Sequence, residues 1–264
     1  MDNILEVRDL KVWFPIKKGV LGLTAGYVKA VDGVSFDVRR GETLGVVGES
    51  GCGKSTTSRA ILMLNKPTGG TITLDGEDLV KSSKKASFRR KVQVVFQDPA
   101  AALNPRHTVM EILTEGMVYH RLCKKSERRE KAIELLKMVG MPDTILDRYP
   151  HEFSGGQRQR LCIARAIALR PELLICDEAV SALDLTIRAQ VLDLLADLKA
   201  KLGLSMIFIT HDLGVVQHIA DRIIVMHKGR IVESGEADEV LKHPKEEYTR
   251  RLMAAVPQIG KPLV

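Results

Sequence analysis

A glycine-rich segment in the first quarter of the chain has the residue types and spacing that bind phosphate. Residues 48–55 read Gly-Glu-Ser-Gly-Cys-Gly-Lys-Ser, which fits the pattern G-x-x-x-x-G-K followed by Ser or Thr, between a predicted strand and a predicted helix. Glycines let the backbone N–H groups of such a loop converge on one anion, and the following helix adds its positive end. Lys54 is expected to reach the β- and γ-phosphates of a nucleotide, and the Ser55 hydroxyl to bind Mg²⁺. The predicted contacts of this nucleoside triphosphate site are Gly48, Ser50, Gly51, Cys52, Gly53, Lys54, Ser55 and Thr56.

A pair of carboxylates follows an apolar strand in the second half of the chain. Residues 173–178 read Leu-Leu-Ile-Cys-Asp-Glu. Asp177, at the end of the strand, is placed to hold Mg²⁺ through water. Glu178 projects differently because it is one residue further along, and its carboxylate can polarise an attacking water. Together with the phosphate loop, this pair predicts a catalytic role rather than a simple turn cap.

A second anion-binding arrangement lies between these two motifs. Residues 153–157 read Phe-Ser-Gly-Gly-Gln and lead directly into the helical segment RQRLCIARAIAL. A serine, two glycines and a helix N-terminus suit an anion, yet one nucleotide does not need two such loops from one subunit. The arrangement therefore predicts a head-to-tail dimer in which the serine-glycine loop of each subunit closes over the γ-phosphate bound to its partner.

The elements that must position these motifs alternate between strand and helix. Apolar segments predict strands at 4–14, 30–38, 42–48, 92–96, 173–176, 205–210 and 222–229. Helices are predicted at 54–64, 126–140, 187–203 and 213–220. The second of these helices is expected to be N-capped by Ser126 and to end near Gly140. Continuous apolar strands that alternate with helices predict a mostly parallel α/β sheet covered on both faces, and the helical stretch 98–161 predicts an insertion into it.

Composition and cysteine usage exclude several classes of protein. The chain has 264 residues, 45% of them apolar and 28% charged, which is typical of a globular protein that buries a substantial core. No stretch approaches the roughly 18 uninterrupted apolar residues of a membrane span, and the start lacks a signal-peptide layout, so we expect neither a membrane-spanning nor a secreted protein. The net charge of +7 is compatible with a nucleic-acid partner, an anionic membrane surface or phosphate ligands, and a solvated basic surface is the favoured interpretation. The four cysteines never form a CxxC pair, so the sequence predicts no zinc site, iron–sulfur cluster or disulfide framework.

These motifs, in this order, resemble those of the ATP-binding cassette (ABC) family over nearly the whole chain. GESGCGKST resembles its Walker A motif, LLICDE its Walker B motif and FSGGQ its signature, with Phe153 where leucine is usual. Residues 181–184, Ser-Ala-Leu-Asp, resemble the D-loop, and Gln97, after VQVVF, resembles the Q-loop glutamine. His211, after SMIFIT, is at the position of the switch histidine.

The resemblance implies an α/β fold, namely a P-loop NTPase (RecA-like) core with an N-terminal antiparallel β subdomain and an inserted α-helical subdomain. Residues 1–264 would form a single ABC nucleotide-binding domain. The expected divisions are an ATPase core with the β subdomain at 1–97 and 162–245, a helical subdomain with the signature motif at 98–161, and a short C-terminal tail at 246–264.

The resemblance also implies a role for each motif residue. Glu178 would be the general base, His211 would contact the γ-phosphate and help to position the water, and Gln97 would touch Mg²⁺ or the attacking water and relay the nucleotide state. The expected Mg²⁺ ligands are Ser55, Gln97 and Asp177. The residues expected to serve the nucleotide of the opposite subunit, or to link the two sites, are Ser154, Gly155, Gly156, Gln157 and Asp184.

An aromatic side chain near the start of the chain is expected, from the same resemblance, to stack on adenine. The chain offers Trp13, Phe14 and Tyr27 in this region. We predict Tyr27, because it lies just before AVDGVSF, close to where the aromatic residue of the family falls. The alternative for Trp13 and Phe14 is that they pack within the sheet.

Three kinds of ABC protein compete as interpretations. They are the energy-coupling subunit of a membrane transporter, a soluble ATPase that acts on ribosomes or DNA, and a nucleotide-binding partner with little activity. The chain has one cassette, no coiled-coil or zinc insertion, and both Glu178 and His211, so the transporter subunit is favoured. Residues 96–106, FQDPAAALNPR, resemble the extended Q-loop of the dipeptide, oligopeptide and nickel importers.

Membership of that group would imply a set of cofactors and partners. ATP and Mg²⁺ are the expected cofactors. The expected partners are a second homologous ATPase subunit, two transmembrane permease subunits and, indirectly, an extracytoplasmic solute-binding protein, with no nucleic acid. The expected function is to energise the import of di- or oligopeptides from the cytoplasmic face of the membrane. Import of nickel or a metal chelate is the alternative.

Overall fold

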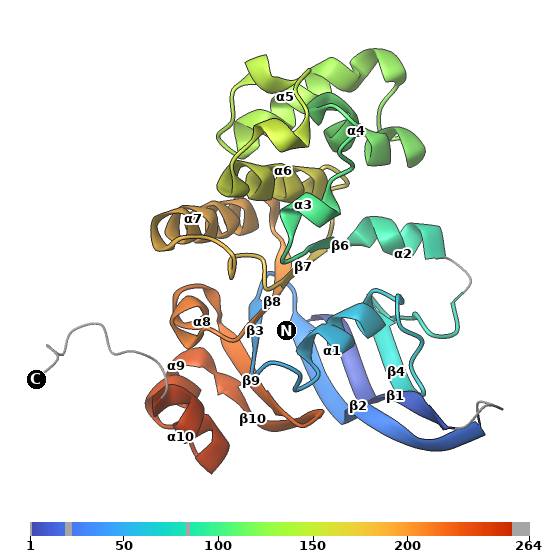
Figure 1. Cartoon of the computed structure of the whole chain (residues 1–264), viewed down its shortest axis with the longest axis vertical. Helices are drawn as coiled ribbons and strands as arrows, with labels where there is room; N and C mark the ends of the chain where they lie inside the picture. The colour runs from blue at the N-terminus through green and yellow to red at the C-terminus, as the bar shows by residue number, and fades with distance from the viewer. Residues whose placement is uncertain (1, 19–22, 83–84, 255–264) are drawn as a thin grey trace, which may run out of the picture. The chain divides into compact units, whose positions relative to one another are not determined.

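The computed structural model describes residues 2–18, 23–82 and 85–254, and these fall into two compact units (Figure 1). One unit comprises Met1–Lys81 and Phe208–Val264, and the other comprises Ser82–Ile207. The described residues do not include 19–22, which lie between the predicted strands 4–14 and 30–38. They also do not include 255–264, which belong to the predicted C-terminal tail. Within the described ranges, no helix has the length and apolar character needed to span a bilayer.

The N-terminal part of the first unit forms an antiparallel sheet with the strand order β2-β1-β4-β5. Its strands are β1 (Asn3–Lys18), β2 (Leu23–Arg39), β4 (Gly69–Leu74) and β5 (Glu77–Asp78). Leu5 of β1 lies opposite Val38 of β2, and Val7 lies opposite Phe36; all four side chains are buried. These cross-strand apolar pairs fix the register, because a slip by one residue would turn them to the other face.

A parallel strand pair in the same unit carries the phosphate loop. β3 (Thr43–Val47) is buried throughout and lies parallel to β9 (Arg222–His227), and β10 (Arg230–Glu236) is antiparallel to β9. The helices of the unit are α1 (Lys54–Ile61), α8 (Leu213–Ile219), α9 (Ala237–Lys242) and α10 (Glu247–Ala254). Buried residues of β3, α8, β9 and α9 form one apolar cluster, against which α10 packs. This cluster holds the strand that leads into the loop.

The second unit combines a parallel strand pair with the helical segment. Its strands β6 (Val92–Val95) and β7 (Leu173–Asp177) are parallel. Its α-helices are α2 (Lys85–Lys91), α3 (Pro99–Ala102), α4 (Val109–Tyr119), α5 (Arg128–Met138), α6 (Gly155–Ile167) and α7 (Leu185–Leu202), with 3₁₀ helices at Lys125–Glu127, Asp143–Ile145 and Pro150–Glu152. Helices α4, α5 and α6 pack against one another (Figure 1). The boundary between the two units falls within β8 (Ser205–Thr210).

The start of α5 differs from the prediction. The predicted N-cap, Ser126, is wrong, because Ser126 lies in the 3₁₀ helix Lys125–Glu127 and α5 begins at Arg128. The backbone N–H of Lys124 donates to the Glu127 carboxylate at 2.8 Å, so an acidic side chain three residues further on caps this turn instead. Gly140 has a φ of 67° and ends the helix as predicted.

A partly buried ion cluster joins β9 to the end of β2 within the first unit. Nη1 of Arg222 lies 3.1 Å from the Asp37 carboxylate and 3.0 Å from the Glu42 carboxylate. Burial raises the pKa of the Glu42 carboxyl, and the Arg222 guanidinium opposes that rise. Arg222 is therefore the nearer of two cations that make the buried position of Glu42 tolerable, the other being Arg39 at 3.7 Å.

We expect Arg222→Ala to lower the free energy of unfolding by about 2 kcal/mol, because the buried Glu42 carboxylate loses its hydrogen-bonded cation and keeps only Arg39, at 3.7 Å. Urea unfolding at pH 7 measures the change. Arg8→Ala is the matched control, since Arg8 pairs with Glu6 on the surface and should change stability by less than about 0.5 kcal/mol. Equal small effects of the two substitutions would contradict this account of the cluster.

Candidate active site

The phosphate loop connects β3 to α1 and is tightly enclosed by the backbone of neighbouring segments. Gly48 has a φ of 149° and Gly53 a φ of 111°, both in the region that favours glycine. A Cβ atom at Gly48 would lie 2.3 Å from the carbonyl oxygen of Met226, and one at Gly53 would lie 2.4 Å from that of Ala30. The N–H of Gly229 donates to the Cys52 carbonyl at 2.9 Å. Glycine is therefore required at positions 48 and 53, because the backbone of neighbouring segments occupies the space that a side chain would need.

The lysine of the loop is buried and held by the loop itself. Lys54 is only 4% exposed. Its ammonium donates to the carbonyls of Gly48 at 2.7 Å and Glu49 at 2.9 Å. A buried charge needs such partners, and here they keep a cation in the loop whose amides are expected to receive an anion.

The other predicted loop contacts lie in the same unit. Ser50 and Gly51 are exposed at the turn, whereas Ser55 and Thr56 are half-buried in the first turn of α1. That first turn contains no acidic residue, so nothing opposes the positive end of the helix. The structure therefore brings the predicted phosphate contacts together, with the predicted Mg²⁺ ligand Ser55 at the helix start.

The predicted acidic pair lies where β7 ends. Asp177 is the last residue of β7 and is buried, and Glu178 follows with a φ of 52°. Such a conformation is uncommon for a residue other than glycine, and strain of this kind concentrates at functional sites. The hydroxyl and the backbone N–H of Ser181 both donate to the Glu178 carbonyl, at 2.9 Å and 3.1 Å. The D-loop segment thus fixes the backbone that carries the proposed base.

The Q-loop glutamine follows the neighbouring strand of the same unit. Val95 of β6 lies opposite Cys176 of β7 in the parallel register, so Gln97, two residues after β6, and Asp177, the last residue of β7, lie at the carboxyl ends of adjacent strands. Gln97 is exposed, and the next residue, Asp98, N-caps α3 by accepting from the N–H of Ala100 at 2.8 Å. The strand pair and the cap together set the direction of the segment that carries Gln97.

The signature segment begins α6 with a capping box. The Ser154 hydroxyl accepts from the N–H of Gln157 at 3.3 Å, and the Gln157 side chain accepts from the N–H of Ser154 at 3.0 Å. Ser154, Gly155 and Gln157 are exposed. Phe153, the residue that departs from the usual leucine, is buried under the Arg148 guanidinium, 4.9 Å from its ring centre. Phe153 therefore supplies a buried apolar side chain before the helix, and the polar residues at the helix start are exposed.

Helix α7 starts beside α6. A Cβ atom at Gly156 would lie 2.5 Å from a methyl carbon of Ile187, so the two helices approach closely at this glycine. Asp184 N-caps α7 by accepting from the N–H of Ile187 at 3.0 Å. Within the second unit, the predicted signature and D-loop residues thus lie at the starts of two packed helices.

The predicted histidine belongs to the first unit. His211 follows β8 and is exposed, and the next residue, Asp212, N-caps α8 by accepting from the N–H of Gly214 at 3.0 Å. The cap fixes the backbone of the segment that carries His211. Its role toward the γ-phosphate stays a prediction.

The aromatic candidates for adenine occupy the paired ends of β1 and β2. Trp13 is engaged by its neighbours, since its indole N–H donates to Asp32 at 3.2 Å and the Lys29 ammonium lies 4.4 Å from its ring centre. Tyr27 is 54% exposed, with its ring centre 6.2 Å from that of Trp13. Phe14 is 43% exposed and, as the residue after Trp13 on a strand, points to the opposite face. Tyr27 therefore remains the predicted platform, with Phe14 the other exposed ring.

The buried cysteines are packing residues. All four thiols are free and buried. Burial raises the pKa of Cys162 to about 11 and that of Cys176, beside Asp177, to about 12. These thiols stay protonated at neutral pH and offer no thiolate to a metal or substrate.

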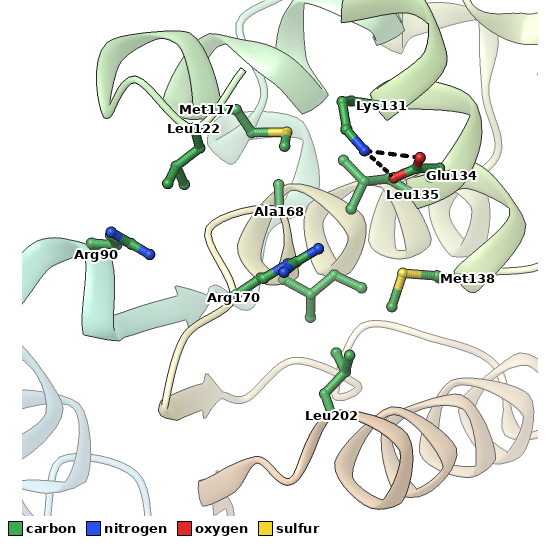
Figure 2. A pocket seen from close by; sticks show the side chains of 11 residues that line it. Arg90, Met117, Leu122, Lys131, Glu134, Leu135, Met138, Ala168, Arg170 and Leu202 are labelled. Atoms are coloured by element: carbon green, nitrogen blue, oxygen red, sulfur yellow. Dashed lines mark hydrogen bonds and ion pairs between the residues drawn. The ribbon is translucent and has the colours of Figure 1, made fainter. Parts of the chain in front are cut away.

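A separate cavity of about 410 Å³ lies in the second unit (Figure 2). Methionine and leucine side chains form part of its lining, together with Arg90, Arg170 and the ion pair between Lys131 and Glu134 at 2.9 Å. Its lining includes none of the predicted nucleotide, metal or signature residues. The predicted active site is therefore the set of loops described above and not this cavity.

One contact to the phosphate loop was not predicted from the sequence. The backbone N–H of Glu49 donates to the hydroxyl of Tyr248, on α10, at 3.2 Å. The two residues are 199 positions apart, and no motif links them. No signal in the sequence identifies this pair.

Comparison with known proteins gives these motifs a family context. Residues 31–181 match the family described as ABC transporter. The chain is 50% identical over 259 residues to the dipeptide transport ATP-binding protein DppF of Escherichia coli (strain K12), covering 97% of this chain and 77% of that protein. It is 50% identical over 263 residues to the oligopeptide transport ATP-binding protein AppF of Bacillus subtilis (strain 168), covering 98% and 80% respectively. A dimeric post-hydrolysis structure of the ATP-binding cassette MJ0796 bound to ADP and Pi matches with a TM-score of 0.77 and 28% identity, over 88% of this chain and 98% of that one.

We expect Lys54→Ala to weaken ATP binding at least about tenfold, because it removes the buried ammonium that serves the phosphates. Titration with a fluorescent ATP analogue measures the affinity. Lys66→Ala, which removes an exposed lysine just beyond α1, is the matched control and should bind like the unmodified chain. Unchanged affinity in Lys54→Ala would contradict the assignment of the loop.

Proposed function

Because the chain belongs to the ABC transporter family, we propose that it is the ATPase subunit that energises import of di- or oligopeptides through a membrane transporter. The observation that carries the proposal is identity of about 50% over nearly the whole chain to proteins named for dipeptide and oligopeptide transport. Within this family the chain is an ABC-type ATPase. Its place would be the cytoplasmic face of the membrane, where ATP is available.

The first unit supplies the phosphate site. The loop amides and the N-terminus of α1 bind the β- and γ-phosphates, and the buried Lys54 ammonium offsets their charge. Because the loop is already enclosed by Met226, Ala30 and Gly229, little rearrangement is needed when the nucleotide binds. Preorganised donors of this kind stabilise charge that develops on the phosphates during hydrolysis.

Mg²⁺ fits the donors that the predicted site provides. The hydroxyl of Ser55, the amide of Gln97 and the carboxylate of Asp177 all offer oxygen, the ligand type that Mg²⁺ prefers. In the described parts of the chain, no group of three or more His, Cys, Asp or Glu could hold a metal without further help. We propose that these three residues would hold Mg²⁺ together with the nucleotide phosphates, because each of them offers an oxygen ligand. When bound, it neutralises charge on the transferred phosphoryl group.

Glu178 is the proposed general base. Its carboxylate takes a proton from the attacking water, and the hydrogen bonds from Ser181 keep its strained backbone in place. His211 is proposed to contact the γ-phosphate and to orient the same water. Gln97 is proposed to sense the nucleotide and to pass its state to the permease subunits.

A second ATPase subunit would complete each site. Ser154, Gly155 and Gln157 are exposed at the start of α6, as a loop that serves the nucleotide of a partner requires. The MJ0796 structure is described as dimeric, which supports pairing of this chain with a second ATPase subunit. Asp184, at the start of α7, would link the two sites. Two permease subunits and an extracytoplasmic solute-binding protein complete the proposed complex.

The transport proposal is tested in proteoliposomes that contain this chain, its partner ATPase, both permeases and the binding protein. We expect di- or oligopeptides to stimulate ATP hydrolysis, whereas nickel or a nickel chelate leaves the basal rate unchanged. Stimulation of ATP hydrolysis by the nickel species alone would contradict peptide import and would support the alternative of metal import. Failure of the chain to assemble with any permease would refute a transport role.

We expect Glu178→Gln to reduce ATP turnover by at least about 100-fold while ATP binding is retained, because the amide has the size of the base without its proton affinity. Phosphate release under single-turnover and steady-state conditions, together with ATP titration, separates the two effects. Glu130→Gln, which alters an exposed glutamate of α5, should leave both unchanged. Normal phosphate release in Glu178→Gln would refute the assignment of the base.

A further inference from the structure

Tyr248 and Lys54 both bind the backbone of Glu49 in the phosphate loop. The Glu49 N–H donates to the Tyr248 hydroxyl at 3.2 Å, and the Glu49 carbonyl accepts from the Lys54 ammonium at 2.9 Å. One loop residue therefore connects the C-terminal helix to the catalytic lysine. Since Lys54 also donates to Gly48, the segment held by Tyr248 is the same segment that holds the buried cation.

The Tyr248 ring is set by the strand that lies beside the loop. Its centre is 3.9 Å from that of the His227 imidazole, with 39° between the ring planes. His227 ends β9, and two residues later the N–H of Gly229 donates to the Cys52 carbonyl at 2.9 Å. Burial raises the pKa of the Tyr248 phenol, so the group at the loop is a neutral hydroxyl at physiological pH. The β9–β10 turn and Tyr248 thus hold the loop at Cys52 and at Glu49.

Helix α10 is anchored at its start and along its apolar side. The Glu233 carboxylate, on β10, accepts from the N–H of Lys245 at 2.8 Å and of Glu246 at 3.2 Å, just before the helix begins. Tyr248 and Leu252 pack against the apolar cluster that includes residues of β3 and β9. The position of the hydroxyl is therefore fixed by the same core that fixes the strand leading into the loop.

We propose that Tyr248 is a positioning residue for ATP binding, whose hydroxyl fixes the start of the phosphate loop and, through it, the Lys54 ammonium. The inference rests on the proposed use of this loop as the ATP site. A hydrogen bond that exists before the nucleotide arrives lowers the ordering cost of binding. Helix α10 then sets the affinity for ATP, although no residue of it belongs to a nucleotide motif.

The test compares the full chain with its Tyr248→Phe variant, which keeps the ring against His227 and removes only the hydroxyl. We expect the Kd for a fluorescent ATP analogue, measured on the chain, and the KM for ATP, measured in the reconstituted transporter, to rise about two- to tenfold, which is the range of one net hydrogen bond. The kcat should stay within about twofold, because the lost interaction serves ground state and transition state alike. Amide hydrogen exchange at Glu49 should become faster, since its N–H loses its acceptor.

Tyr119→Phe is the matched control, because it removes the hydroxyl of a tyrosine that is 77% exposed on α4. It should leave Kd, KM and the exchange at Glu49 unchanged. Wild-type Kd and KM in Tyr248→Phe would overturn the proposal, as would weaker binding without faster exchange at Glu49. A failure of the unmodified chain to bind ATP would refute the nucleotide site itself. Absence of peptide stimulation in proteoliposomes would refute only the transport role.

Discussion

The close approach of other backbone segments to the phosphate loop is the constraint on which the first unit depends. Carbonyl groups of Met226 and Ala30 lie where side chains at Gly48 and Gly53 would be, and Gly229 donates into the loop at Cys52. The loop can direct its N–H groups toward an anion only if its own conformation is held in place. Here the backbone of these neighbouring segments holds it. The pairing of β3 with β9 brings Met226 to the loop, and a hydrogen bond from the N–H of Asp32 to the Gly229 carbonyl joins β2, which carries Ala30, to the turn after β9. Strand register in this unit is therefore a requirement of phosphate binding.

Four of the other motif segments share a second feature, which is a capped helix start. Asp98, Ser154, Asp184 and Asp212 each N-cap the helix that begins at their motif. A cap satisfies backbone N–H groups that the helix leaves unpaired and fixes the chain that enters the helix. Motif residues are thus held by hydrogen bonds to their near neighbours. Such local fixation suits loops that must bind a nucleotide or a partner and still keep their shape.

Features formed by residues adjacent in the sequence were predictable, because they depend on interactions between near neighbours in the chain. The alternation of apolar strands and helices predicted the α/β fold, and the glycine spacing at 48–53 predicted the phosphate loop. The boundaries were less predictable. Strands β1 and β2 extend beyond the predicted 4–14 and 30–38, because residues 13–18 pair with residues 23–29 irrespective of their polarity. At α5 a 3₁₀ turn precedes the helix and includes Ser126, so α5 begins at Arg128 and the Glu127 carboxylate accepts from the N–H of Lys124 at the start of that turn.

The sequence by itself indicated the chemistry of this protein, because phosphate loops and carboxylates at strand ends are patterns of adjacent residues. The tertiary structure decided which distant groups support that chemistry. Arg222 meets Glu42 across 180 positions of sequence, and Tyr248 meets Glu49 across 199. Such pairs depend on strand register and on where a helix packs. A single tyrosine or arginine carries no local pattern that would reveal its partner, so only the folded chain shows which groups hold the loop and its strands.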